Sequence, residues 1–264
     1  MEVTTKVGCG INCIYCPQDI FIRAYNKRSN AFRMSFKVFK KCIDKIPQTE
    51  NITFSGMCEP WLNPDCTRML LYAHKKGFKT IAYTTLTGIS LSDIDLIASI
   101  NNVHLQVHLP SKEKYEKITV DSNYLEVLKK LSKSDIKAYF HCHTKNTLPK
   151  IKEILKNDIK YVPLHSRCGL IKTKGIEIPK RKRGIISCSW KFGPPYLKTS
   201  DFAVLLPNGE VLFCCNDFGM KHILGNLLLS DYKFLWRGEE FLKILRGMSK
   251  DEKPDIICRN CNGI

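Results

Sequence analysis

The sequence predicts an α/β fold in which a parallel sheet with outer helices curls into a partial (β/α)6 barrel, followed by a small C-terminal α+β domain. The first observation is a regular alternation of strand-like and helix-like segments, about six βα units in roughly the first 165 residues. The second is length, because a complete eight-stranded barrel normally needs about 250 residues. The third is the basic segment 175–184, where the alternation ends.

Each element of the first region follows from its hydrophobic period and its end signals. Ser35 is the expected N-cap of one helix with apolar residues at helical spacing, and Gly77 ends the next helix. The expected strands are residues 3–7, 51–54, 79–85, 103–109, 136–143 and 161–165. The expected helices are residues 35–46, 65–76, 92–100, 122–132 and 148–157.

The C-terminal region has a different pattern. Residues 202–206 and 211–215 are apolar runs that flank Asn208-Gly209, a strong hairpin signal. A helix is expected over residues 239–247. We therefore predict two domains, residues 1–175 and 185–264.

Composition and charge narrow the function classes. The 264 residues are 44% hydrophobic and 25% charged, which suits a globular core. No apolar run reaches the roughly 18–20 residues of a membrane span, and the first ten residues lack a secretory signal. We therefore expect a cytoplasmic protein without a membrane partner. It has 13 cysteines, and those that are clustered in the sequence are expected to serve metal or redox sites rather than disulfides.

Cys9, Cys13 and Cys16 place three thiols within eight residues, in the loop after the first strand. Three thiolates can hold three corners of an iron–sulfur cube, whereas cubane clusters usually have four cysteine ligands. The missing ligand indicates an iron that binds another molecule. Zinc is the alternative, although structural zinc sites prefer four protein ligands.

The spacing C-x3-C-x-aromatic-C after a first strand resembles the signature of the radical S-adenosylmethionine (SAM) superfamily, which also has a partial (β/α)6 barrel. The resemblance implies a [4Fe–4S] cluster on Cys9, Cys13 and Cys16, with an open iron that chelates SAM. One electron from an external reductant of flavodoxin or ferredoxin type then cleaves SAM. The resulting 5′-deoxyadenosyl radical removes a hydrogen atom from the substrate.

Two further segments match this superfamily. Gly56-Met57-Cys58-Glu59 resembles its Gly-Gly-Glu motif, which implies that Gly56, Met57 and Glu59 bind SAM. Cys58 stands where the second glycine of the motif usually stands. Tyr15 matches the aromatic residue whose backbone contacts the adenine.

A second cysteine group lies in the C-terminal third. The Gly209-x4-Cys214 spacing and the Cys258-x2-Cys261 pair resemble the auxiliary iron–sulfur domain of the superfamily, called SPASM in its long form and twitch in its short form. The short form fits, since only three residues follow Cys261. The resemblance implies a second [4Fe–4S] cluster on Cys188, Cys214, Cys258 and Cys261. Cys214 and Cys215 are adjacent, so the motif spacing favours Cys214 as the ligand, and a zinc ribbon is the alternative for the whole group.

Polar residues on the later strands are expected to line the pocket, because functional residues gather at the C-terminal ends of barrel strands. His108, at a serine position of the family's fourth strand, is expected to contact SAM or substrate. We expect a histidine with a near-neutral pKa among His108, His143 and His165 to accept a proton. Arg167 is the expected contact for an anionic substrate, and Cys168 is a possible hydrogen-atom donor.

The net charge of +17 favours a small anionic, sugar- or nucleotide-like substrate over nucleic acid, because no RNA-binding signature accompanies the basic runs. A cluster with four thiolate ligands has no free iron, so we expect it to relay an electron during oxidation of an alcohol. The chain resembles short dehydrogenases of the superfamily that act on aminocyclitol alcohols. The alternatives are a small-molecule epimerase, a zinc-ribbon RNA-binding protein and a peptide-modifying enzyme, the last opposed by the eight residues before Cys9.

Overall fold

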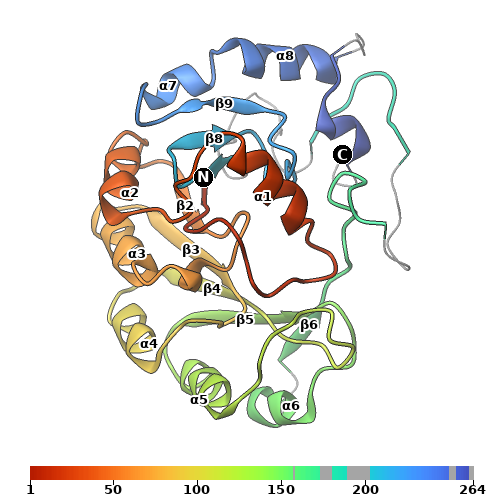
Figure 1. Ribbon diagram of the computed structural model, residues 1–264. Coiled ribbons are helices and arrows are strands. Elements are labelled where there is room, and N and C mark those ends of the chain that lie inside the picture. Colours follow the sequence, from red (N-terminus) through yellow and green to blue (C-terminus); the bar gives the residue numbers. More distant parts are fainter. Residues whose placement is uncertain (157, 173–179, 189–202, 250–253, 262–264) are drawn as a thin grey trace.

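The computed structural model describes residues 1–156, 158–172, 180–188, 203–249 and 254–261 (Figure 1). Within them one nine-stranded sheet has the order β6-β5-β4-β3-β2-β1-β7-β8-β9. The first six strands are parallel to their neighbours. They are β1 (Glu2–Val3), β2 (Asn51–Phe54), β3 (Lys79–Thr84), β4 (Val103–His108), β5 (Lys137–Cys142) and β6 (Ile159–Tyr161).

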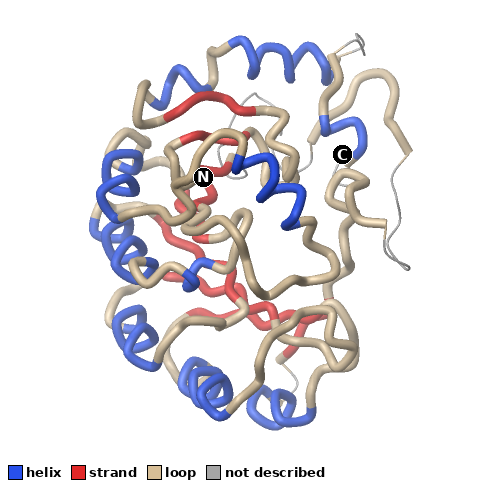
Figure 2. The backbone as a smooth tube through the Cα atoms, in the orientation of Figure 1, coloured by secondary structure: helices blue, strands red, loops and turns tan. Residues whose placement is uncertain are grey.

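Helices follow these strands on the outside of the sheet. They are α2 (Phe36–Ile43), α3 (Cys66–Lys75), α4 (Leu91–Ala98), α5 (Ser122–Leu131) and α6 (Pro149–Leu155). Figure 2 shows them along the outer side of an arc whose inner side is formed by the strands. Since β6 and β9 are the two ends of the described sheet, the arc stays open. The α/β fold and its partial barrel are confirmed.

Local capping explains where several helices begin. The Ser35 side chain accepts a hydrogen bond from the Val38 backbone N–H at 3.2 Å, as expected for an N-cap. Ser90 and Asp93 form a reciprocal capping box at the start of α4. Asp121 accepts a hydrogen bond from the Tyr124 N–H at 2.8 Å and so begins α5.

The C-terminal elements extend the barrel sheet. β7 (Val204–Leu205) pairs parallel with β1, while β8 (Glu210–Leu212) and β9 (Ile223–Asn226) continue antiparallel. Figure 1 places α7 (Tyr232–Leu235) and α8 (Glu239–Met248) beyond β9. Two short 3₁₀ helices complete the described elements, η1 (Pro60–Leu62) and η2 (Ile257–Asn260).

Helix α1 (Gln18–Asn26) was not predicted from the sequence, and it follows the cysteine loop directly. Its buried Phe21 and Tyr25 belong to the same apolar cluster as Val204 and Phe218. The helix therefore packs against the C-terminal strands rather than within the outer row of helices.

Several predicted boundaries were wrong. The sixth strand covers residues 159–161 instead of 161–165, because its pairing with β5 ends at Cys142↔Tyr161 and the next carbonyl, of Val162, is bonded by His143. The first strand ends at Val3, and Lys6 pairs with Arg33 instead. Strand β9 and helix α7 were missed. Residues 157 and 202, and residues 175–179 of the basic connector 175–184, lie outside the described residues.

No helix in the part of the chain that the structure describes has the length and apolarity to cross a bilayer.

Candidate functional site

The cysteine loop, residues 9–16, joins β1 to α1 at the C-terminal end of the barrel strands. A segment that follows β4 holds it by backbone pairing. The Ile14 N–H donates to the Tyr115 carbonyl at 2.9 Å, and the Lys117 N–H donates to the Ile11 carbonyl at 2.9 Å. This one segment therefore holds the loop at two positions, Ile11 and Ile14.

The three thiols of this loop lie close enough for their charges to interact. Burial raises the pKa of all three, that of Cys13 to about 12. Backbone hydrogen bonds from Ile11 and Glu59 favour the thiolate form of Cys9. A metal ion deprotonates a coordinating thiol outright, which would offset the effect of burial. Three gathered thiols with backbone donors at the sulfur fit three ligands of an iron–sulfur cluster.

The segment Gly56–Glu59, after β2, lies against this loop. Gly56 has a φ of +79°, and the Met57 N–H donates to Thr4 Oγ1 at 3.0 Å. The Glu59 carboxylate accepts hydrogen bonds from Thr84 Oγ1 at 2.8 Å and from the Thr85 N–H at 2.6 Å. Burial raises the pKa of Glu59, although these donors act in the opposite direction. Strand β3 thus holds the predicted SAM-binding carboxylate in place.

Gln18, the first residue of α1, connects the cysteine loop to this segment and was not predicted. Its Oε1 accepts from the Cys9 N–H at 3.4 Å, and its Nε2 donates to Cys16 Sγ at 3.5 Å. The same Nε2 donates to the Met57 carbonyl. Gln18 is buried, so one amide ties two predicted cluster ligands to a predicted SAM-binding residue.

Tyr15 is also anchored by a residue that the sequence did not reveal. Its hydroxyl donates to Glu116 Oε1 at 2.7 Å, and the other oxygen of Glu116 accepts from the N–H and hydroxyl of Ser111 at 3.0 and 2.9 Å. Glu116 and Ser111 are both buried. These bonds fix the ring and therefore the backbone of the third-cysteine segment.

Three histidines lie together beside Tyr15: His108 at the end of β4, His141 in β5, and His143 just after β5. The rings of His108 and His141 are 4.7 Å apart, those of His108 and His143 5.5 Å, and those of Tyr15 and His143 4.4 Å. His143 Nδ1 lies 3.0 Å from the Val162 carbonyl. A carbonyl only accepts, so Nδ1 carries the proton and Nε2 of neutral His143 is the acceptor.

The expectation of a near-neutral histidine is wrong for His108. Burial, followed by the charges of His141, His143 and Arg167, lowers the pKa of His108 to about 3. Burial also lowers the pKa of His143 and His165, and Arg167 adds to this effect at both. The group is thus neutral at pH 7, and His108 is a weak base.

Arg167 lies between the two cysteine groups. Its Nη1 donates to Asn216 Oδ1 at 3.2 Å. Its charge acts on the Cys16 thiol, whose pKa burial raises. It also acts on Cys215, whose pKa is raised first by a hydrogen bond with Cys214. The predicted anion contact therefore faces the histidines from the side of the C-terminal region.

The second cysteine group is buried, and includes Cys188, Cys214, Cys258 and Cys261. Arg259, within the terminal Cys-x2-Cys pair, is fully buried and donates to four backbone carbonyls, those of Lys182, Gly184, Gly247 and Ser249, at 2.7–3.1 Å. Among the described residues no three histidine, cysteine or acidic side chains have the spacing of a single-ion site. A cube of four irons bonds thiols that lie farther apart than the ligands of one ion.

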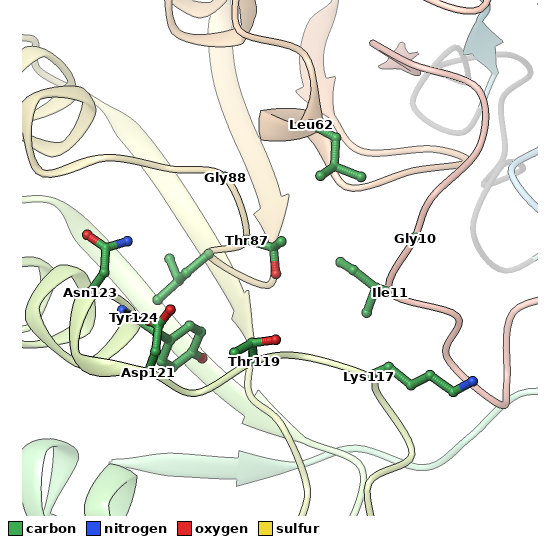
Figure 3. Close-up of a pocket in the computed structure, with 11 residues that line it drawn as sticks. Gly10, Ile11, Leu62, Thr87, Gly88, Lys117, Thr119, Asp121, Asn123 and Tyr124 are labelled. Atoms are coloured by element: carbon green, nitrogen blue, oxygen red, sulfur yellow. Dashed lines mark hydrogen bonds between the residues drawn. The ribbon is translucent and has the colours of Figure 1, made fainter.

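A separate cavity of about 280 Å³ opens beside the cysteine loop (Figure 3). Ile11, Leu62, Thr87 and Thr119 surround it, and the buried Tyr124 hydroxyl in its wall has no hydrogen-bond partner in the described structure. None of the histidines lines it. The cavity is therefore distinct from the histidine-lined region.

Comparison with known proteins bears on both halves of the chain. The S-adenosyl-L-methionine-dependent 2-deoxy-scyllo-inosamine dehydrogenase of Niallia circulans is 22% identical over all of this chain and 92% of its own length. The crystal structure of BtrN in complex with AdoMet and 2-DOIA has a TM-score of 0.62 at 16% identity, covering 100% of this chain and 92% of that one. Streptococcus suis SuiB bound to the precursor peptide SuiA has a TM-score of 0.67 at 15% identity, covering 99% and 70%. These structures share the fold.

Two protein-family models match the sequence, one in each part of the chain. The radical SAM superfamily model matches residues 3–160, and the iron–sulfur cluster-binding domain SPASM matches residues 198–262. The first match covers more than half of the chain and contains the whole cysteine loop and the Gly56–Glu59 segment. The chain therefore belongs to the radical SAM superfamily, with its [4Fe–4S] cluster and SAM as cofactors and an auxiliary iron–sulfur domain at the C-terminal end.

Proposed function

We propose that this enzyme oxidises an alcohol group of a small anionic or sugar-like substrate to a ketone. When bound, SAM and the first cluster would supply a 5′-deoxyadenosyl radical that removes a hydrogen atom from the substrate, and the auxiliary cluster would supply a nearby acceptor for one electron. The dehydrogenase relative from Niallia circulans supports this reaction class. The overall change would remove two electrons and two protons from the substrate.

The observation that carries the proposal is the position of Arg167. Its charge acts on His108, His143 and His165 and on Cys16 of the first thiol group. It also acts on Cys215, which is adjacent to Cys214 of the second group. A substrate held by this guanidinium would lie between both thiol groups. Such a place suits a reaction in which hydrogen is removed on one side and an electron leaves on the other.

We assign the substrate hydroxyl proton to His143 rather than His108. His143 presents Nε2 as an acceptor, because Nδ1 is bonded to the Val162 carbonyl. A positioned base must lie within hydrogen-bond reach of the proton that it removes. His108, with a pKa of about 3, would instead accept a hydrogen bond from SAM or substrate without becoming protonated.

The SAM-binding roles follow the predicted positions. Glu59 would accept a hydrogen bond from the SAM amino group, and Gly56 and Met57 would offer backbone groups beside it. Tyr15 would contact the adenine through its backbone, which the Tyr15–Glu116 bond holds in place. An external one-electron reductant, of flavodoxin or ferredoxin type, would start each turnover.

The test is product counting with the anaerobically reconstituted enzyme, SAM and a panel that includes 2-deoxy-scyllo-inosamine, sugar phosphates and nucleotides. We expect one ketone and one 5′-deoxyadenosine for each SAM consumed. His143→Gln should reduce kcat by about 10²-fold or more, the usual contribution of a general base. His104→Gln, at the opposite end of β4, is the matched control and should leave kcat unchanged.

If the product formed in deuterated water is an isomer of its substrate and carries solvent deuterium at carbon, the reaction is an epimerisation and this proposal is wrong. Turnover of a peptide but of no small alcohol would replace it by peptide modification.

A further inference from the structure

His222, just before β9, is a buried histidine to which the predicted chemistry assigns no role. Its side chain is 1% exposed, and both ring nitrogens form hydrogen bonds. Nδ1 lies 2.7 Å from Oε1 of Glu240, and the backbone N–H of Ile257 donates to Nε2 at 3.2 Å. Because a backbone N–H only donates, Nε2 carries no proton and Nδ1 donates to the carboxylate. The geometry therefore fixes both the tautomer and the orientation of the ring.

The bond from Ile257 places this ring at the start of the terminal cysteine turn. Ile257 is the first residue of η2, which contains Cys258 and is followed by Cys261. The first N–H groups of a helix have no partner within it, and Ile256, which precedes η2, has no side-chain oxygen to accept from them. Nε2 of His222 supplies this acceptor from a residue 35 positions away.

The backbone of His222 holds the other thiol-bearing turn. Its carbonyl accepts from the Phe213 N–H at 2.9 Å, and its N–H donates to Oδ2 of the buried Asp217 at 2.7 Å. Phe213 precedes Cys214, and the Asp217 N–H donates to the Cys214 carbonyl at 3.0 Å. One residue thus fixes the Cys214 turn through its main chain and the Cys258 turn through its ring.

Helix α8 supports this arrangement at both of its ends. Glu240, in the first turn, orients the His222 ring. At the other end, the carbonyls of residues 247 and 249 accept hydrogen bonds from the Arg259 side chain at 2.7 and 2.9 Å. Cys258 is therefore held on both sides, through His222 before it in the chain and through Arg259 after it.

We propose that His222, oriented by Glu240, is a positioning residue of the auxiliary iron–sulfur site, which holds the Cys258-x2-Cys261 turn in place beside Cys214 before the cluster binds. It is not a ligand and transfers no proton or electron, because it acts only through the Ile257 N–H. Without this acceptor the turn loses a direct bond to the hairpin, and its two thiols must be ordered when the cluster binds. The proposal rests on the assignment of these cysteines to the auxiliary cluster and not on the alcohol substrate.

The test uses the Cys9→Ala/Cys13→Ala/Cys16→Ala chain, reconstituted anaerobically, so that only auxiliary iron is measured. His222→Phe keeps a ring of similar size but removes the acceptor. We expect iron release to a chelator to become about 10–100-fold faster, the usual contribution of a residue that orients a metal ligand. His222→Gln restores an acceptor oxygen and should release iron at a rate closer to that of the parent chain. His74→Phe, on α3, is the matched control.

Two substitutions of Glu240 separate positioning from simple loss of a histidine. Glu240→Gln keeps an acceptor for the Nδ1–H of His222 and should retain the iron, whereas Glu240→Leu should release it faster, as His222→Phe does. Nitrogen NMR of the apoprotein with labelled histidine gives a readout without metal. The ring signals that disappear in His222→Phe should show a proton on Nδ1 and none on Nε2. Circular dichroism checks that each variant is folded.

Three results would overturn the proposal: iron release at the parent rate in both His222→Phe and Glu240→Leu, equally fast release in His222→Phe and His222→Gln, or a protonated Nε2 in the parent apoprotein. Retention of about four irons in Cys258→Ala would overturn the ligand assignment on which it rests. No substrate is present in these measurements, so their outcome is independent of the reaction proposed above.

Discussion

Gly56→Ala should destabilise the protein and weaken SAM binding, because Gly56 has two separate constraints. Its φ of +79° is in the left-handed region, which costs an alanine about 1–2 kcal/mol. A Cβ at this position would also collide with Thr4 Oγ1 and lie 3.0 Å from Val204 Cγ1. Movement of Thr4 would break its 3.0 Å hydrogen bond from the Met57 N–H, worth about 1–3 kcal/mol when the donor is left buried.

The two contributions together give about 2–5 kcal/mol. At roughly 2–4 °C per kcal/mol for a chain of this size, the Tm should fall by about 6–12 °C for a loss near 3 kcal/mol. Displacement of Met57 and Glu59 should weaken SAM binding at least about tenfold, the equivalent of 1.4 kcal/mol.

The assay is thermal unfolding of the anaerobically reconstituted protein, with calorimetric titration of SAM. Gly184→Ala is the control for backbone strain alone, since its φ is +71° and a Cβ there would have no atom within 4 Å. Gly10→Ala has neither constraint and should leave the Tm unchanged. In a Thr4→Ala background the additional cost of Gly56→Ala should shrink toward the strain contribution. If Gly56→Ala matches Gly184→Ala in Tm and binds SAM normally, the collision argument is refuted.

Three further outcomes follow from other contacts. Gln18→Leu removes the N–H donor to Cys16 Sγ and should make the reduction potential of the SAM-binding cluster more negative. The potential is measured by a redox titration monitored by electron paramagnetic resonance, and an unchanged value would mean that this bond does not act on the cluster. Arg259→Met leaves four backbone carbonyls without their donor, that of Gly247 in a buried hydrogen bond and the other three in partly buried ones. It should lower the free energy of unfolding by about 2–4 kcal/mol, with loss of auxiliary iron, whereas an unchanged urea midpoint and iron count would contradict this role. His108 has a pKa lowered to about 3, so its contribution to stability is present above the unfolded value of about 6.5 and is lost as pH falls toward 3, by about 1.4 kcal/mol per pH unit. Urea unfolding of the apoprotein between pH 5 and 7 should therefore depend less on pH in His108→Phe, and an equal slope in both proteins would contradict the neutral, buried histidine.

Local spacing was enough to predict the chemistry of the first site. The positions of Cys9, Cys13 and Cys16 lie within one loop, and the Gly56–Glu59 segment lies within one turn. Short segments of this kind keep their geometry wherever the fold places them. The alternation of strands and helices likewise predicted the sheet, because each strand must bury its apolar residues beneath a helix.

The ends of the strands and the pKa values of the histidines depended on contacts with residues distant in the sequence. The sixth strand ended early because β5 offered no partner beyond Cys142 and His143 bonded the Val162 carbonyl. Burial lowers the pKa of His108, and the strand register adds to this effect because it places His141 beside it. Neither effect has a signal in the residues next to His108 in the sequence.

The sequence by itself therefore determined the cofactor and the superfamily, through motifs whose residues are neighbours in the chain. Only the tertiary structure decided which distant residues support that site. Gln18 reaches Met57, Tyr15 reaches Glu116 across 101 residues, and Cys168 meets Cys261. Such pairs are selected by the path of the backbone through the sheet, which sets the distance between side chains independently of their separation in sequence.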